Sequence, residues 1–109
     1  MAETHKVLGQ SNPSATTATT LYTVPGGTQA IISTLVVANR SGTPTTFRVA
    51  IRPGGATLDN AHYVAFDAPI GANEIWSFTC GFTLAATDVV TVYAGAATLT
   101  FSAYGVEIS

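Results

Sequence analysis

The chain has 109 residues, enough for one domain with an apolar core of its own, and charged residues make up only 9% of it. Ordinary soluble domains carry about 25%. The net charge of -2 is too small to argue for nucleic acid or another strongly charged partner. The single cysteine, Cys80, excludes an internal disulfide and a zinc site built from several cysteines.

The surface composition favours association between copies. Thr occurs eighteen times and Ala seventeen times, so few charges are available to keep copies apart. A soluble monomer wetted by threonine hydroxyl groups is the simpler interpretation. We expect instead that neighbours in an assembly cover much of the surface.

The lengths of the apolar runs in the sequence bear on where in the cell the protein is expected. The first ten residues lack the apolar run of a secretory signal. No apolar stretch approaches the ~18 residues that a membrane helix needs. We therefore expect no membrane association, and synthesis in a reducing cytosol until the protein joins something larger.

The first elements in chain order are short. Residues 4–10 predict one strand and residues 21–24 another. Between them, residues 11–20 (SNPSATTATT) are small and polar and predict a loop or an extended arm. Pro25-Gly26-Gly27 then suits a type II turn, because proline presets φ and glycine supplies a positive φ.

The stretch Gln29–Arg52 is the centre of the predicted fold and resembles a hairpin. Its first half, Ala30–Ala38, is almost wholly apolar and β-branched, which is typical of a strand buried on both faces. Turn-forming residues occupy 39–44. The second half alternates in hydrophobicity, which predicts a half-buried strand with three inward side chains, namely Phe47, Val49 and Ile51.

Strict alternation assigns the side chains of Ala30–Ala38 to two faces. One face would hold Ile31, Leu35 and Val37, and the other would hold Ile32, Val36 and Ala38. One of these sets fills the core of a sandwich, and the other needs a cover. Because no helix is predicted, we expect another copy of the chain to provide it.

The remaining strands are predicted at 62–69, 75–82, 89–94 and 99–106. The first has Val64 and Phe66 on its apolar face. The second is predicted to be a principal core strand, because large or soft apolar groups recur at every second position: Trp76, Phe78, Cys80 and Phe82. The last two strands are expected to form the closing pair.

Together these elements predict a single all-β domain over residues 1–109. About eight short strands with turns every 8–12 residues are typical of an antiparallel β-sandwich. We favour an eight-stranded jelly roll with no substantial helix over an immunoglobulin-like order, since eight strands fit two Greek keys.

No residue pattern indicates catalysis. His5 and His62 lack further ligands at metal-binding spacing, and Cys80 alternates with aromatic residues as a buried hydrophobe would. No Gly-x-Ser-x-Gly motif is present. The acidic residues that a glycosidase could use lie near predicted strand ends, where solvated acids are common: Asp59, Asp67, Glu74 and Asp88. We predict that the protein is not an enzyme and has no catalytic residue, cofactor or metal.

The arginines leave two interpretations open. Arg48 and Arg52 project from the same face of one strand, and Arg40 lies in the preceding turn. They form either a solvated face or ion pairs with acids of an adjacent subunit, for which the guanidinium fork is well suited. The predicted interface set is therefore Ile32, Val36, Arg40, Arg48 and Arg52.

Three tyrosines support a different function. Tyr63, Tyr93 and Tyr104 lie opposite the apolar faces of their strands and could stack on a sugar ring. A carbohydrate-binding module is the less favoured alternative.

Several segments carry a resemblance to a known family. They are KVLGQ from residue 6, LYTVPGGTQA from 21, LVVANR from 35, TTFRVAIRP from 45, HYVAFDAPIGANE from 62 and GFTLAATDVVTVYA from 81. The series covers nearly the whole chain and resembles small structural proteins of tailed-bacteriophage virions.

This resemblance implies a non-enzymatic virion component. Small jelly-roll proteins of this kind often decorate or cement the head, commonly as trimers where capsid subunits meet. We favour such a capsid decoration protein, whose partners are its own copies and other virion proteins such as the major capsid protein. A tail, baseplate or fibre-attachment protein is the alternative.

Overall fold

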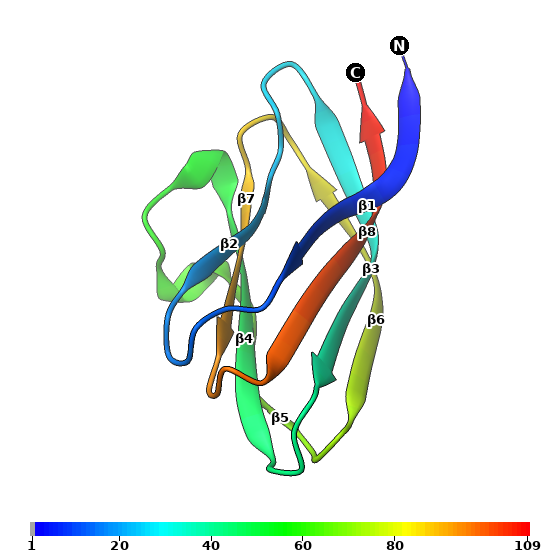
Figure 1. Cartoon of the computed structure of the whole chain (residues 1–109). Coiled ribbons are helices and arrows are strands. Elements are labelled where there is room, and N and C mark those ends of the chain that lie inside the picture. Colours follow the sequence, from blue (N-terminus) through cyan, green and yellow to red (C-terminus); the bar gives the residue numbers. More distant parts are fainter. Residues whose placement is uncertain (1) are drawn as a thin grey trace.

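The computed structural model, which describes residues 2–109, contains eight strands in two antiparallel sheets of four (Figure 1). Sheet A has the order β1-β8-β3-β6, and sheet B has the order β2-β7-β4-β5. The strands are β1 (Glu3–Ser11), β2 (Thr19–Thr23), β3 (Gln29–Asn39), β4 (Thr45–Arg52), β5 (Tyr63–Ile70), β6 (Ile75–Leu84), β7 (Val89–Ala94) and β8 (Leu99–Ile108). The all-β prediction is confirmed.

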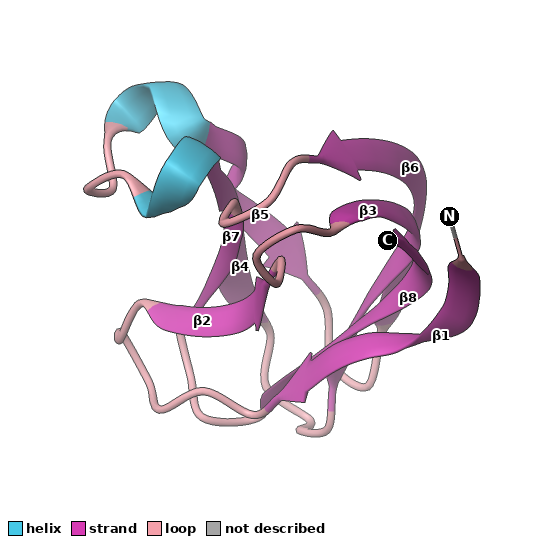
Figure 2. Cartoon of the chain, turned by 90° about the horizontal axis from the view of Figure 1, so that it is seen from above, coloured by secondary structure: helices cyan, strands magenta, loops and turns pink. Residues whose placement is uncertain are grey.

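Helical structure within the described residues is limited to two 3-10 turns, η1 (Pro53–Gly55) and η2 (Asn60–His62). Both lie in the connection between β4 and β5, beside sheet B (Figure 2). None of the described helical segments is long and apolar enough to cross a membrane.

The predicted hairpin over Gln29–Arg52 is wrong, although its two strands exist. β3 pairs with β6 and β8, whereas β4 pairs with β5 and β7. The turn at 40–44 thus carries the chain from sheet A to sheet B. The predicted closing pair, β7 and β8, is separated in the same way. Alternation reveals which face of a strand is apolar. It does not reveal whether the strand pairs with the preceding strand in one sheet or lies in the opposite sheet, because the apolar face is buried in both cases.

The core lies between the sheets and is built from the inward side chains of both. Its largest fully buried members are Phe47, Phe101, Ile32, Leu35, Ile70 and Leu99. The Phe47 ring occupies its aromatic centre, with ring centroids 5.9 Å from Trp76 and 6.2 Å from Phe101. The inward positions predicted for β4 are confirmed for Phe47 and Val49, which are fully buried.

A β-bulge in β3 corrects the predicted faces of that strand. In the pairing with β8, Ser33 is an extra residue of β3 between Ile32 and Thr34, and it reverses the alternation. In the pairing with β6 the extra residue lies in β6, where Cys80 and Gly81 stand opposite Ser33. Ile32, predicted to lie in the subunit interface, is 0% exposed and belongs to the core. Ile31 takes its place on the outer side with Val36, as the register shows.

Irregularities at the same level of neighbouring strands bend sheet A. β1 shifts register between Val7 and Gly9, and β6 carries Gly81 at φ 61° opposite the bulge of β3. The upper parts of β1, β3 and β8 accordingly turn away from their lower parts (Figure 1). Bulges and glycines at one level are a standard means of curving a sheet.

Strand β6 is an edge strand of sheet A and not a principal core strand. Phe78, Cys80 and Phe82 pack against the core but are only partly buried, and Trp76 is 37% exposed. The predicted face of the strand is correct, since these side chains all point inward. Period-two spacing cannot tell an edge strand from a central one, because both show the same alternation.

Of the predicted loop at 11–20, residues 12–18 connect β1 to β2 and pack on the end of the domain, while Ser11 belongs to β1 and Thr19 and Thr20 belong to β2. The Asn12 side chain donates hydrogen bonds to the carbonyl groups of Ala97 (3.1 Å) and Leu99 (2.9 Å). Pro13 is buried, and Ala15 forms an isolated bridge with Ala94. These contacts lead the chain from β1 in sheet A to β2 in sheet B.

Candidate functional site

Two of the three arginines predicted for the interface hold turns of the chain itself. Arg40 Nη2 donates to the carbonyl of Ala97 (3.1 Å). Arg52 donates to the carbonyls of Ala56 (2.7 Å) and Gly55 (3.0 Å), and its Nη1 reaches Thr91 Oγ1 (3.3 Å). Both side chains are therefore engaged within the monomer.

Arg48 forms within the chain an ion pair of the kind that one of the two interpretations places across a subunit boundary. Its Nε donates to Asp67 Oδ1 (2.7 Å) and its Nη2 to Asp67 Oδ2 (3.3 Å). The hydrogen bond to Asp67 raises the pKa of Arg48 above its ordinary value. The guanidinium also lies 4.1 Å from the ring centroid of Phe66 and 4.3 Å from that of Tyr93, within cation–π range.

Aromatic side chains gather around Arg48 on the outer side of sheet B. The Tyr63 and Phe66 rings meet edge to face with centroids 4.9 Å apart, and Tyr93 lies directly across from Arg48 in the sheet. Tyr104, the third tyrosine of the predicted sugar-binding set, belongs to sheet A instead. The structure thus brings together Tyr63 and Tyr93, but not Tyr104.

Phe66 is the member of this cluster that the sequence did not reveal. It was placed on the apolar face with Val64, but it is 55% exposed. The pairing of β5 with β4 shifts register between Ala65 and Ala68, and these two alanines face the core instead. The sequence gives only a weak signal of this register shift, because an aspartate such as Asp67 is a common residue near the end of a strand.

The four carboxylates considered for hydrolysis are used separately in turns or in the Arg48 pair. Asp59 accepts a hydrogen bond from the backbone N–H of Asn60, and Glu74 from that of Gly71. Asp88 accepts from Gly54 and Ala85. Within residues 2–109, no group of three His, Cys, Asp or Glu side chains could hold a metal ion.

Cys80 lies in β6 beside the bulge. Its thiol is half-buried and donates to the carbonyl of Ile32 at 3.4 Å. It packs against the core, as a small apolar side chain would.

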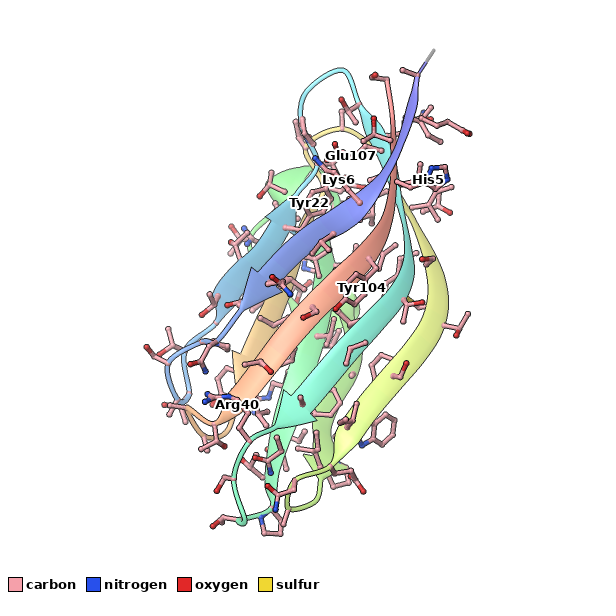
Figure 3. All side chains as sticks on the ribbon, turned by 45° about the vertical axis from the view of Figure 1, so that its right-hand side comes forward. His5, Lys6, Tyr22, Arg40, Tyr104 and Glu107 are labelled. Carbon is pink, nitrogen blue, oxygen red and sulfur yellow. The ribbon has the colours of Figure 1, made fainter. Side chains whose placement is uncertain are left out.

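A polar triad joins the two sheets near the chain ends (Figure 3). The Tyr22 hydroxyl in β2 donates to Glu107 in β8, and Lys6 Nζ in β1 lies 2.9 Å from Glu107 Oε1. The hydrogen bonds from Tyr22 and Lys6 lower the pKa of Glu107. Burial and the contact with Glu107 raise the pKa of Tyr22 above its ordinary value of 10.0, so its hydroxyl stays protonated and donates.

A broad candidate surface is the side of sheet A that faces away from the core, here named the outer face (Figure 3). The strand registers place on it Ile31, Thr34, Val36 and Ala38 of β3; Thr100, Ser102, Tyr104, Val106 and Ile108 of β8; Ile75, Ser77, Thr79 and Thr83 of β6; and Glu3, His5, Val7 and Gln10 of β1. Glu3, at one corner, is the one acidic residue of this set, and the set contains no lysine or arginine.

Several apolar side chains of the outer face are open to solvent. Ile75 is 68% exposed, and Val7 and Tyr104 are also exposed. Val36, which was predicted for the interface, lies near the middle of the face, paired with Ser102 on one side and Ser77 on the other.

Scans and searches against protein-family models, curated proteins and solved structures found no match to this chain.

Proposed function

We propose that this protein is a non-enzymatic structural component of a tailed-phage virion, a capsid decoration or cement protein. It associates with its own copies through the outer face, as a trimer, and binds the particle surface. The observation that carries the proposal is the outer face itself, a broad sheet surface with one acidic residue at its corner.

The strand order supports the finer description of the fold as a jelly roll. Sheets of order β1-β8-β3-β6 and β2-β7-β4-β5 arise when two Greek keys interleave in eight strands. Every connection between consecutive strands crosses from one sheet to the other, apart from that between β4 and β5. Viral capsid proteins and lectins are among the domains built in this way, although a fold alone does not assign a function.

The outer face has the size and chemistry of a contact between subunits. Four strands of about ten residues, ~3.3 Å per residue and ~4.8 Å apart, make a face of roughly 600 Å² before side-chain relief is counted. A standard interface uses about 800 Å² per partner. Because the face is nearly free of charge, two copies can meet on it without burying unpaired ions.

The family resemblance supports a place on the virion, and the tail remains the alternative. A tail, baseplate or fibre-attachment protein would use the same face to pack against neighbours. The two locations differ in copy number, since a head offers many equivalent sites and a tail tip offers a small ring.

Counting the protein in purified particles tests the proposal. We expect it as a stoichiometric component, with electron cryo-microscopy placing many copies on the head at contacts between capsid subunits. A single ring at the tail would select the alternative location. Absence from particles that are otherwise complete would contradict a virion function.

A further inference from the structure

A hollow opens on the outer side of sheet B, away from the face that we propose for self-association. It has a volume of about 440 Å³ and is lined by Asn60, Tyr63 and Phe66. It lies where η2 leads into β5, in the region in which the two 3-10 turns stand beside sheet B (Figure 2). An aromatic hollow with a few polar groups at its rim is the usual form of a small-ligand site.

The aromatic rings that line the hollow are packed against each other and against Arg48. Phe66 meets the Tyr63 ring at an interplanar angle of 83° and is stacked against the Arg48 guanidinium. Arg48 is itself fixed by its two hydrogen bonds to Asp67 and by the Tyr93 ring. A wall already ordered in the free protein loses little entropy when a ligand binds.

A strained residue directs Phe66 outward. Asp67 has a φ of 49°, in the left-handed region that residues other than glycine seldom adopt. The register of β5 against β4 shifts on this side of the strand, which leaves Phe66 on the surface with Ala65 and Ala68 facing the core. Such strain persists where the surrounding structure maintains it, and it gathers at binding sites.

The rim offers hydrogen-bonding groups without net charge. Asn60 belongs to a turn fixed by a capping box between Asp59 and His62, and its side chain is exposed. No hydrogen bond found within residues 2–109 uses the Asn60 side-chain amide. The positive charge of Arg48 is matched by the carboxylate of Asp67, so neither charge is left for an ionic ligand.

We propose that this hollow binds a neutral sugar ring. A pyranose has C–H groups on one face, which pack on the Phe66 and Tyr63 rings, and hydroxyl groups at its edge, which exchange hydrogen bonds with the Asn60 amide. Single-stranded nucleic acid is not favoured, because it needs a groove of unpaired basic side chains beside the aromatic rings. The cancelled charge of Arg48 likewise disfavours acidic sugars.

The site is independent of the proposed function. Self-association uses sheet A, whereas the hollow lies on sheet B. Loss of sugar binding would therefore leave self-association intact, and loss of self-association would leave sugar binding intact.

Chemical-shift mapping by NMR on the intact protein tests the proposal. The probes are methyl glycosides of glucose, galactose, mannose and N-acetylglucosamine, each added at high millimolar concentration. We expect at least one of them to shift the signals of Asn60, Tyr63 and Phe66. Phe66→Ala and Asn60→Ala should each weaken that binding about tenfold or more, which corresponds to roughly 1.4 kcal/mol.

Val64→Ala is the matched control, because Val64 is an exposed apolar residue of the same strand that does not line the hollow. It should leave the affinity unchanged, and the thermal midpoint of each variant shows whether the fold is retained. The proposal fails if no glycoside shifts these signals, or if Val64→Ala weakens binding as much as Asn60→Ala. It also fails if methyl glucuronide or a proline-rich peptide binds here more tightly than every neutral glycoside.

Discussion

Asn39 is a buried amide whose hydrogen-bonding capacity is fully used. It is 4% exposed at the end of β3 and ties together three connections at one end of the molecule. Its Nδ2 donates to the carbonyls of Thr43 (2.9 Å) and Gly71 (3.0 Å), and its Oδ1 accepts from Ser41 N–H (3.1 Å) and the Thr98 hydroxyl (3.2 Å). Asn39-Arg40-Ser41 matches the Asn-x-Ser pattern of N-glycosylation, but the Asn39 amide is buried and already bonded within the chain.

We expect Asn39→Ala to lower the free energy of unfolding by about 2–4 kcal/mol, because it leaves buried partners without a hydrogen bond. Asn12→Ala is the matched control. It also removes two hydrogen bonds to carbonyl groups, but Asn12 is exposed, so water replaces them and the loss is about 1 kcal/mol or less. Urea denaturation measures both. Equal losses in the two variants would show that burial of Asn39 is unimportant.

Glu107 makes stability depend on pH at the acidic end. Its pKa is lowered in the folded protein by the hydrogen bonds from Tyr22 and Lys6, so the folded state binds a proton less readily than the unfolded state. The resulting stabilisation is fully present above the unfolded pKa near 4.5 and is lost as the pH falls through the folded value.

We therefore expect the free energy of unfolding to fall between about pH 6 and pH 3 more steeply in the wild type than in Glu107→Gln. Denaturant titrations at a series of pH values measure the slopes. Glu3→Gln removes an exposed carboxylate from the neighbouring strand and serves as control. Parallel slopes for the wild type and Glu107→Gln would contradict the role of the triad.

At the scale of elements, the bend of sheet A depends on glycines where strands approach closely. A Cβ on Gly105 would lie 1.9 Å from the carbonyl oxygen of Ile31, and one on Gly9 would lie 2.2 Å from that of Leu21. Both obstacles are backbone atoms that cannot rotate away. Gly26, by contrast, has no atom within 4 Å of such a Cβ.

We expect Gly105→Ala to cost at least about 3 kcal/mol and to lower the thermal midpoint by more than about 10 °C, or to prevent folding. Gly26→Ala should change stability by no more than about 0.5 kcal/mol. Thermal unfolding followed by circular dichroism compares the two. An unchanged midpoint in Gly105→Ala would mean that the bend does not require a glycine.

The sequence predicted the strands of β3 and β4 well and their pairing badly. The apolar run at Ala30–Ala38 falls within β3 and the alternation at 47–52 falls within β4, because each strand buries one face in the core. The pairing depends on whether the turn at 40–44 leads the chain back into the same sheet or across to the other sheet. The same turn-forming residues occur in both kinds of connection. The sequence also gives no clear indication of the bulge at Ser33, because a serine is compatible with the inner and the outer face of a strand.

The same local effects explain what was missed at the candidate sites. One inserted residue moved Ile32 into the core and Ile31 outward, so the interface prediction retains Val36 but not Ile32. At the hollow, Tyr63 and Tyr93 could be inferred from alternation, whereas Phe66 depended on the backbone conformation of Asp67. Long-range partners such as Arg48 and Asp67 meet only because β4 and β5 pair.

At the scale of the whole molecule, the few charges are concentrated away from the outer face. Lys6 pairs with Glu107, Arg48 pairs with Asp67, and the other two arginines hold loops through carbonyl groups. The molecule is 45 × 27 × 19 Å, so its two broad sides are larger than any of its other sides. A small domain that leaves one broad side nearly free of charge has little electrostatic protection against association on that side.

Sedimentation equilibrium of the isolated protein tests self-association through the outer face most directly. The account predicts an oligomer for the wild type and a monomer for Val36→Lys, which places a charge in the middle of the face. Thr57→Lys adds the same charge at an exposed position between η1 and η2 and should remain oligomeric, with both variants retaining the wild-type circular dichroism spectrum. A wild-type protein that stays monomeric at high concentration, or a Val36→Lys variant that associates as strongly as the wild type, would contradict the account.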